Sequence, residues 1–359
     1  TRTENTNYFS NNYKCGRGLE YNDSQEMRIE TLTLTDWADA LPATGFEWAH
    51  APEVLRVLRD HVTGELRLYG GFNGQQLVGL LPVVVRTELF ATAVISPPPG
   101  FAIPRMGPLL VTRNSEQRER ERINRTFTDA VLERIAGHGP LTLVGLSCSP
   151  EYTDPRPYRW AGFDTKTRFS YRLALDATTP ETVFQSFNRR IRREIRDAEN
   201  AGVTVSCRGI EGARAVYEAY KTRRNEQGDG YPVSWEYTRD LVTALSERAR
   251  VYVAETPEGE FASGVTVVFS NDEAYFFQGG ARGDRSGVGA NALLHWRIIE
   301  DILTDPALDS VSRYDLGNAN IETLARYKSQ YGGELVPQYL ITSGRLMDLA
   351  RRAYELLAY

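Results

Sequence analysis

Apolar and polar positions in the first half of the chain predict strands around one long helix. The runs GELRLYGGF and LVGLLPVVV alternate as strands do, and Asn73–Gly74 between them favours a β-hairpin turn. A charged segment with helical period follows at 115–136, then the buried strand LTLVGL. Smaller features are a strand at 28–32, a helix capped by Thr35, a helix from Pro52, and strands at 93–96 and 106–111.

The second half repeats this order of elements. A strand YRLALD leads into a helix from Pro180, capped by Thr178 or Thr179. Three alternating runs, ARVYVAE, FASGVTVVF and EAYFFQGGA, predict an antiparallel meander, and helix, strand, short helix and strand follow. Two similar orders in one chain indicate a duplicated α/β fold with a mixed sheet. We expect a disordered leader over 1–27, domains over 28–170 and 171–345, and a final helix over 346–359.

Length and composition agree with two soluble globular domains. The chain has 359 residues, and domains of about 150 residues are typical. It contains no run of 18 apolar residues, and three cysteines at unrelated positions form neither a disulfide framework nor a metal-binding motif. These features predict a cytoplasmic protein with no metal site. The net charge of −5 argues against general affinity for nucleic acids.

A lone lysine marks the segment from Gly287 to Gly333. On a helical wheel, Ile321, Leu324 and Ala325 share one stripe with Lys328, so the stripe is apolar except for this cation. A buried ammonium without a partner costs several kcal/mol. Either Lys328 reaches water along its aliphatic stem, or it binds a ligand or takes part in catalysis.

Arginines crowd one face of the helix predicted after Pro180. Four apolar residues from Phe184 to Ile195 share one side, and Arg189, Arg192, Arg193 and Arg196 cluster roughly opposite. This face is either a solvated surface with ion pairs or a platform for an anion such as tRNA, a nucleotide or a phosphorylated acceptor. Arg193 and Arg196 are the predicted anion contacts.

A glycine loop precedes the helix that follows the meander. Gly287 and Gly289 at its end can leave backbone N–H groups free to bind a diphosphate, or they can simply form a turn and a helix start. His295, at the edge of the apolar stripe of that helix, is interpreted as a core histidine. Neither a Ser-His-Asp nor a Cys-His set is evident among the four histidines.

Taken in order, these motifs resemble the Fem-type, BioF2-like acyltransferases, relatives of the peptidoglycan aminoacyltransferases. The order is a glycine loop, a Leu-Leu-x-Trp helix, Asp-Leu-Gly at a strand end, and Tyr-Lys-x-x-Tyr-Gly-Gly. The segment IRDAE at 195–199, followed by GV at 202–203, is similar to a second family motif. The resemblance implies tandem GNAT-like domains and direct transfer of an acyl or aminoacyl group to an amine. The donor would be acyl-CoA or an aminoacyl-tRNA, with no tightly bound cofactor.

The resemblance also implies roles for individual residues. Asp315 and Asn318 fall at the strand end where the acceptor amine would be oriented, and Lys328 stands where acyl-CoA enzymes of this fold carry a tyrosine. Asp284 replaces the glutamine or arginine of their diphosphate loop, so we expect weak binding of acetyl-CoA. The expected acceptor is a small molecule or an envelope precursor. The alternatives are an aminoacyl-tRNA-dependent transferase and a catalytically silent module that binds an anionic ligand.

Overall fold

The computed structural model describes residues 27–88, 91–111, 116–138, 141–176, 178–281 and 289–344. The expected leader and final helix, together with Asp284 and Gly287, therefore lie outside the described residues. Within them, a single mixed sheet runs through the molecule in the order β1-β2-β3-β4-β6-β13-β7-β12-β11-β10-β9-β8, with β5 beside β3. This architecture confirms the predicted α/β class with a mixed sheet.

In the first half, strands β1 to β6 carry helices α1 to α4. The core of this half includes Phe127 of α3, which packs directly on the hairpin of β2 and β3. Gly79 makes that approach possible, because a Cβ atom there would lie 2.7 Å from the Phe127 ring. The predicted hairpin is confirmed: Asn73 pairs with Gln76, and Gly74 has φ of 61°. The elements are β1 (Met27–Thr31), α1 (Leu34–Ala40), η1 (Trp48–His50), α2 (Pro52–His61), β2 (Glu65–Asn73), β3 (Gln76–Thr87), β4 (Thr92–Ser96), β5 (Leu109–Leu110), α3 (Gln117–Ala136), β6 (Thr142–Ser147) and α4 (Arg156–Trp160).

In the second half, the predicted meander is confirmed as β9, β10 and β11, which pair antiparallel. Helix α9 lies on this meander, and its Trp296 packs edge-on against Phe187 in the largest apolar core of the half. The elements are β7 (Asp164–Ala174), α5 (Pro180–Ser186), α6 (Arg189–Asn200), β8 (Thr204–Arg208), α7 (Ile210–Glu226), α8 (Trp235–Leu245), η2 (Ser246–Arg248), β9 (Ala249–Glu255), β10 (Phe261–Phe269), β11 (Glu273–Ala281), α9 (Ala290–Thr304), η4 (Pro306–Leu308), β12 (Arg313–Asn318), α10 (Glu322–Lys328), η5 (Ser329–Tyr331) and β13 (Glu334–Thr342).

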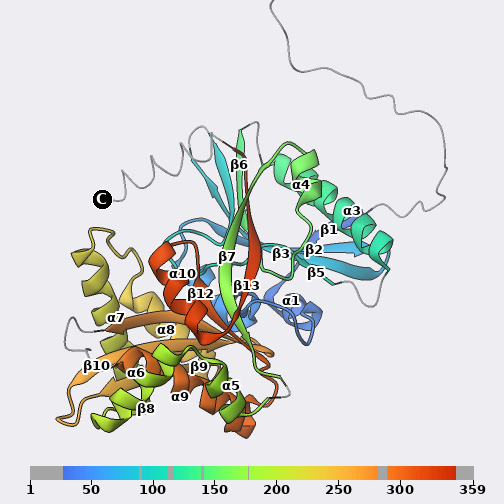
Figure 1. Ribbon diagram of the computed structural model, residues 1–359. Coiled ribbons are helices and arrows are strands. Elements are labelled where there is room, and N and C mark those ends of the chain that lie inside the picture. The colour runs from blue at the N-terminus through green and yellow to red at the C-terminus, as the bar shows by residue number, and fades with distance from the viewer. Residues whose placement is uncertain are drawn as a thin grey trace, which may run out of the picture.

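Two long strands join the halves. Figure 1 shows β7 and β13 running side by side through the centre, between two parts covered by helices. The end of β13 also pairs with β6, so the last strand of the chain reaches the sheet of the first half. The expected domain boundary, between residues 170 and 171, falls inside β7.

Three local expectations are wrong. Thr33 rather than Thr35 caps α1, because its side chain accepts from Asp36 N while Asp36 accepts from Thr33 N. Of the strand expected at 106–111, two residues pair as β5, because the segment before them turns towards the second half. The helix expected from Pro180 through the arginines ends at Ser186. A new helix begins at Arg189, and Asn188 caps it.

Candidate active site between the two halves

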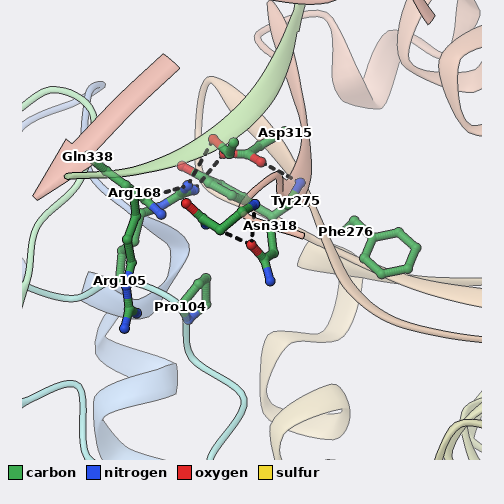
Figure 2. Close-up of a pocket in the computed structure, with 11 residues that line it drawn as sticks. Pro104, Arg105, Arg168, Tyr275, Phe276, Asp315, Asn318 and Gln338 are labelled. Carbon is green, nitrogen blue, oxygen red and sulfur yellow. Dashed lines mark hydrogen bonds and ion pairs between the residues drawn. The ribbon is translucent and has the colours of Figure 1, made fainter. Parts of the chain in front are cut away.

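A cavity of about 390 Å³ opens where the first half meets β7, β11, β12 and β13. Figure 2 shows Gln338 and Phe276 on opposite sides of Asp315, with dashed lines from Asp315 to its neighbours. The lining residues are Pro104, Arg105, Arg168, Ser170, Tyr275, Phe276, Asp315, Gly317, Asn318, Asn320 and Gln338. Two of the residues singled out from the sequence, Asp315 and Asn318, are among them.

The cavity exists because two parallel strands separate. β11 and β12 pair through three residues, the last pair being Tyr275 with Asp315. Beyond Tyr275, the edge of β11 that faced β12 has no strand partner among the described residues. An unpaired edge offers backbone N–H and C=O groups to an extended ligand. The site therefore combines a polar cavity with an open strand edge.

A bulge in β12 gives the site its shape. The pairing of β12 with β7 shifts between Asp315 and Asn318, where Gly317 adopts φ of 78°. The carboxylate of Asp315 stabilises this turn, because its Oδ1 accepts from Gly317 N at 2.6 Å. A left-handed residue between Asp315 and Asn318 strongly favours glycine. The DLGN sequence thus fits this bulge, and the bulge places Asn318 at the cavity.

Arg105 lies beside Asp315 and comes from the other half of the protein. Its Nη2 is 2.8 Å from Asp315 Oδ2, its Nε is 3.1 Å from Glu47 Oε1, and its Nη1 donates to Gln338 Oε1 at 3.1 Å. Arg105 and Glu47 are each 2% exposed, and Asp315 is 1% exposed. Burial acts to lower the pKa of Arg105, but the carboxylates of Asp315 and Glu47 outweigh it and raise that pKa. Burial raises the pKa of Glu47.

A second ion pair lies next to this one. Arg172 donates to both oxygens of Glu273, at 2.7 and 2.9 Å, and also to Glu151 of the first half at 2.9 Å. Burial raises the pKa of Glu273 to about 8, against the opposing effect of Arg172. Asp272, the residue immediately before β11, bonds Arg313 and accepts from Gly45 N of the first half. Charged groups therefore connect the halves around the cavity.

Lys328 lies behind the bulge and is half-buried. Its Nζ donates to the main-chain oxygen of Asn318 at 2.8 Å and lies 5.8 Å from the centre of the Phe276 ring. Burial lowers the pKa of Lys328 to about 8, and Asp315 partly opposes this. The stripe that carries Lys328 is not buried as expected: Ile321 and Leu324 are 51% and 36% exposed, whereas Tyr327 of the same helix packs against the apolar core.

His295 is a core histidine, as expected. Its Nδ1 lies 3.1 Å from the hydroxyl of Tyr314, and its ring stacks on Phe276. Burial, with a contribution from the charge of Lys328, lowers the pKa of His295 to about 3. The ring is therefore neutral at physiological pH and lies between the site and the core of α9.

Gly289, Arg193 and Arg196 lie at another place, on α6 and at the start of α9. Gly289 precedes α9 with φ of 69°, and its Cα is packed against the backbone of Glu194 in α6. Arg193 is 82% exposed and bonds Asp197, whereas Arg196 lies over the ring of Phe184. Neither arginine lines the cavity.

Sequence reasoning missed Arg105 and Glu47. The available signal was weak: Arg105 stands between Pro104 and Pro108 in a segment without strand pairing, where an arginine has no helical or strand role. Its partners Glu47 and Asp315 are distant in sequence and meet only in the folded protein.

Comparison with known proteins identifies a domain in the second half. Residues 185–329, which include α9, β12 and α10, match the family model of the acetyltransferase (GNAT) domain. The expected GNAT-like fold is confirmed for this part of the chain, and the match supports an acyltransferase. No curated protein matches the sequence.

Solved structures with very different sequences share the fold over the whole GNAT tandem. The crystal structure of FemX has 13% identity and a TM-score of 0.65, covering 92% of this chain and 100% of FemX. The C-terminal domain of a putative lysylphosphatidylglycerol synthetase from Agrobacterium fabrum has 12% identity and a TM-score of 0.55, covering 90% and 96%. A tandem GNAT protein from the clavulanic acid pathway has 16% identity and a TM-score of 0.50, covering 88% and 98%.

The described residues contain neither a membrane-spanning helix nor a metal-binding cluster. None of their helices is both long and apolar enough to cross a membrane. In the same part of the chain, histidine, cysteine, aspartate and glutamate side chains form no group that would hold a metal ion.

Proposed function

We propose that the protein transfers an acyl or aminoacyl group to an amine in the cavity between its two halves. The observation that carries this proposal is the separation of β11 from β12 directly beside Asp315 and Asn318. An extended donor arm would add to the free edge of β11 beyond Tyr275 and bring its carbonyl to the cavity. The acceptor amine would enter from the side lined by Arg168 and Gln338.

Direct transfer needs no covalent intermediate. The amine nitrogen attacks the donor carbonyl and the bond from that carbon to the leaving sulfur or oxygen breaks. The leaving atom takes one proton from a side chain, and the new amide nitrogen gives one proton back to that same side chain. Main-chain N–H groups on the free edge of β11 would stabilise the negative oxygen that forms. Proximity of the two substrates supplies much of the remaining acceleration.

We assign to Lys328 the role of donating a proton to the leaving atom. With a pKa of about 8, its ammonium form predominates at pH 7 and yet releases a proton readily to a thiolate or alkoxide. Asn318 holds the ammonium through its main-chain oxygen and lines the cavity itself. Asp315 orients these groups, because both of its oxygens already accept bonds from Arg105, Ser170 and Gly317.

Two donors fit the proposal. Acyl-CoA is the donor common to GNAT enzymes, and its diphosphate would bind at the start of α9, with Gly287 and Gly289. An aminoacyl-tRNA is favoured by the exposed arginines of α6. Arg193 is next to Glu194, whose backbone lies against Gly289 at the start of α9, so these arginines adjoin the place where the donor would bind. The acceptor would be a small amine or an envelope precursor that carries an amine.

The test is amine-dependent consumption of a donor. Acetyl-CoA and a pool of tRNA charged with labelled amino acids would each be incubated with amino acids, amino sugars and vesicles containing phosphatidylethanolamine, whose headgroup carries an amine. Release of free CoA or of uncharged tRNA is then measured with and without each acceptor. We expect release that depends on one acceptor and is lost in Lys328→Met.

Lys221→Met is the matched control, because it removes an ammonium from α7 that lies over Tyr217, whereas Lys328 bonds Asn318 of the cavity lining. It should retain activity. Binding of a donor without any acceptor-dependent release would contradict the proposal and leave the silent anion-binding module as the better description. Full activity of Lys328→Met would remove Lys328 from the mechanism.

A further inference from the structure

The closest contacts of Asp315 include a guanidinium from the other half of the protein. Arg105 follows β4 in a segment that reaches across to β7, β12 and β13. Its side chain points to Glu47 with Nε, to Asp315 with Nη2, and to Gln338 and Ser170 with Nη1. The guanidinium group is planar, and each of its three nitrogens has a partner, so it fixes the positions of these partners relative to one another.

We propose that Arg105 is a positioning residue: it holds Asp315 and, through the bulge at Gly317, sets where the amine of Lys328 lies. The consequence for catalysis rests on the proposed function, but the positioning itself does not. The first half of the protein would then complete a site whose other groups all belong to the GNAT domain and the strands beside it.

The contacts form one continuous path. Arg105 bonds Asp315 Oδ2 at 2.8 Å, and Asp315 Oδ1 accepts from Gly317 N at 2.6 Å. The next residue, Asn318, presents its main-chain oxygen to Lys328 Nζ at 2.8 Å. Because a left-handed glycine forms the turn, a small rotation of the Asp315 carboxylate changes the direction of that carbonyl.

Glu47 anchors the other end of the path. Its Oε1 bonds Arg105, and its Oε2 has no partner although the side chain is buried. Loss of Arg105 would leave two buried carboxylates without their counter-charge, which is strongly unfavourable in a low-dielectric site. Tyr275 adds a contact, because the guanidinium carbon of Arg105 lies 5.6 Å from its ring centre.

Trace labelling of lysines measures the position of Lys328 without any substrate. The chain contains four lysines, at 14, 166, 221 and 328, so mass spectrometry resolves each modified peptide. The rate of acetylation by acetic anhydride is recorded against pH, with Lys221 as internal reference. The charged or titratable groups that influence Lys328 are Asp315 and His295.

We expect the labelling midpoint of Lys328 to move by at least about half a pH unit in Arg105→Lys and in Arg105→Met. In an Asp315→Asn background, replacing Arg105 should move it no further, because the path is already broken. Arg313→Met is the matched control, since Arg313 lies on β12 with Asp315, bonds Asp272 and, like Arg105, bonds a carboxylate of the other half, here Glu151. It should leave the midpoint unchanged.

Three results would overturn the proposal. The first is a labelling midpoint of Lys328 that stays in place in both Arg105 variants. The second is a midpoint that moves by the same amount when Arg105 is replaced in the Asp315→Asn background. Both Arg105 variants could also fail to fold while Arg313→Met folds, which would make Arg105 a structural residue.

Where transfer is measurable, kcat should fall by about 100-fold in Arg105→Lys with little change in KM, as expected for misplaced groups. If the Arg105 variants shift the labelling midpoint of Lys328 but the wild type transfers no group, the positioning role stands and the proposed function is wrong.

Discussion

Replacing Lys328 with methionine should stabilise the folded protein at neutral pH. The folded pKa of Lys328 is about 8, against an ordinary value of 10.5, because burial disfavours its charged form. Each pH unit corresponds to about 1.4 kcal/mol, so the charged lysine costs about 3 kcal/mol below pH 8. Loss of its bond to Asn318 O removes about 1 kcal/mol of stabilisation. The expected net gain for Lys328→Met at pH 7 is therefore about 2 kcal/mol.

The stability difference between the wild type and Lys328→Met should also depend on pH. Between pH 8 and 10.5 the unfolded lysine binds more protons than the folded one, so the stability of the wild type rises with pH in this window. The variant lacks the titrating group and does not follow this rise. The advantage of the variant should therefore fall to about zero near pH 10.

Urea unfolding at pH 7 and pH 10 measures both quantities for the wild type, Lys328→Met and Lys221→Met. A Lys328→Met variant that is destabilised at pH 7, or that differs from the wild type by the same amount at both pH values, would refute the reasoning. In that case the ammonium would be an anchor of the fold rather than a cation kept for function.

Three further predictions concern other parts of the molecule. The double variant Arg193→Gln, Arg196→Gln should weaken binding of the anionic donor and flatten its salt dependence, measured by titration at several ionic strengths; an unchanged slope would assign both to a solvated face. Calorimetry should find acetyl-CoA binding no tighter than about 1 mM, or about 4 kcal/mol, and micromolar binding would contradict the effect ascribed to Asp284. Gly79→Ala should lower the free energy of unfolding by about 1–3 kcal/mol, because the new methyl group meets Phe127. A Gly79→Ala variant that unfolds like the wild type would show that the ring can move aside.

Much of this protein could be predicted from local patterns in its sequence. The Asn73–Gly74 turn, the three-strand meander and the Thr179 cap depend on neighbouring residues, and all three are confirmed. The Fem-type motifs, whose order extends across the second half, indicated the GNAT fold for the same reason. His295 was identified as a core residue because it borders the apolar stripe of its own helix, although its partners Phe276 and Tyr314 come from β11 and β12.

The functional cavity was decided by tertiary structure. Asp315 and Asn318 were found because a strand end is a local feature, but the bulge at Gly317 depends on how β12 pairs with β7. Glu47 and Arg105 lie in segments without a regular pattern, and they reach Asp315 because β13 and β7 bring the two halves together. The periodicity of a sequence indicates which side of a helix or strand is buried. The partners in a buried ion cluster are far apart in the sequence, and only the folded chain brings them together.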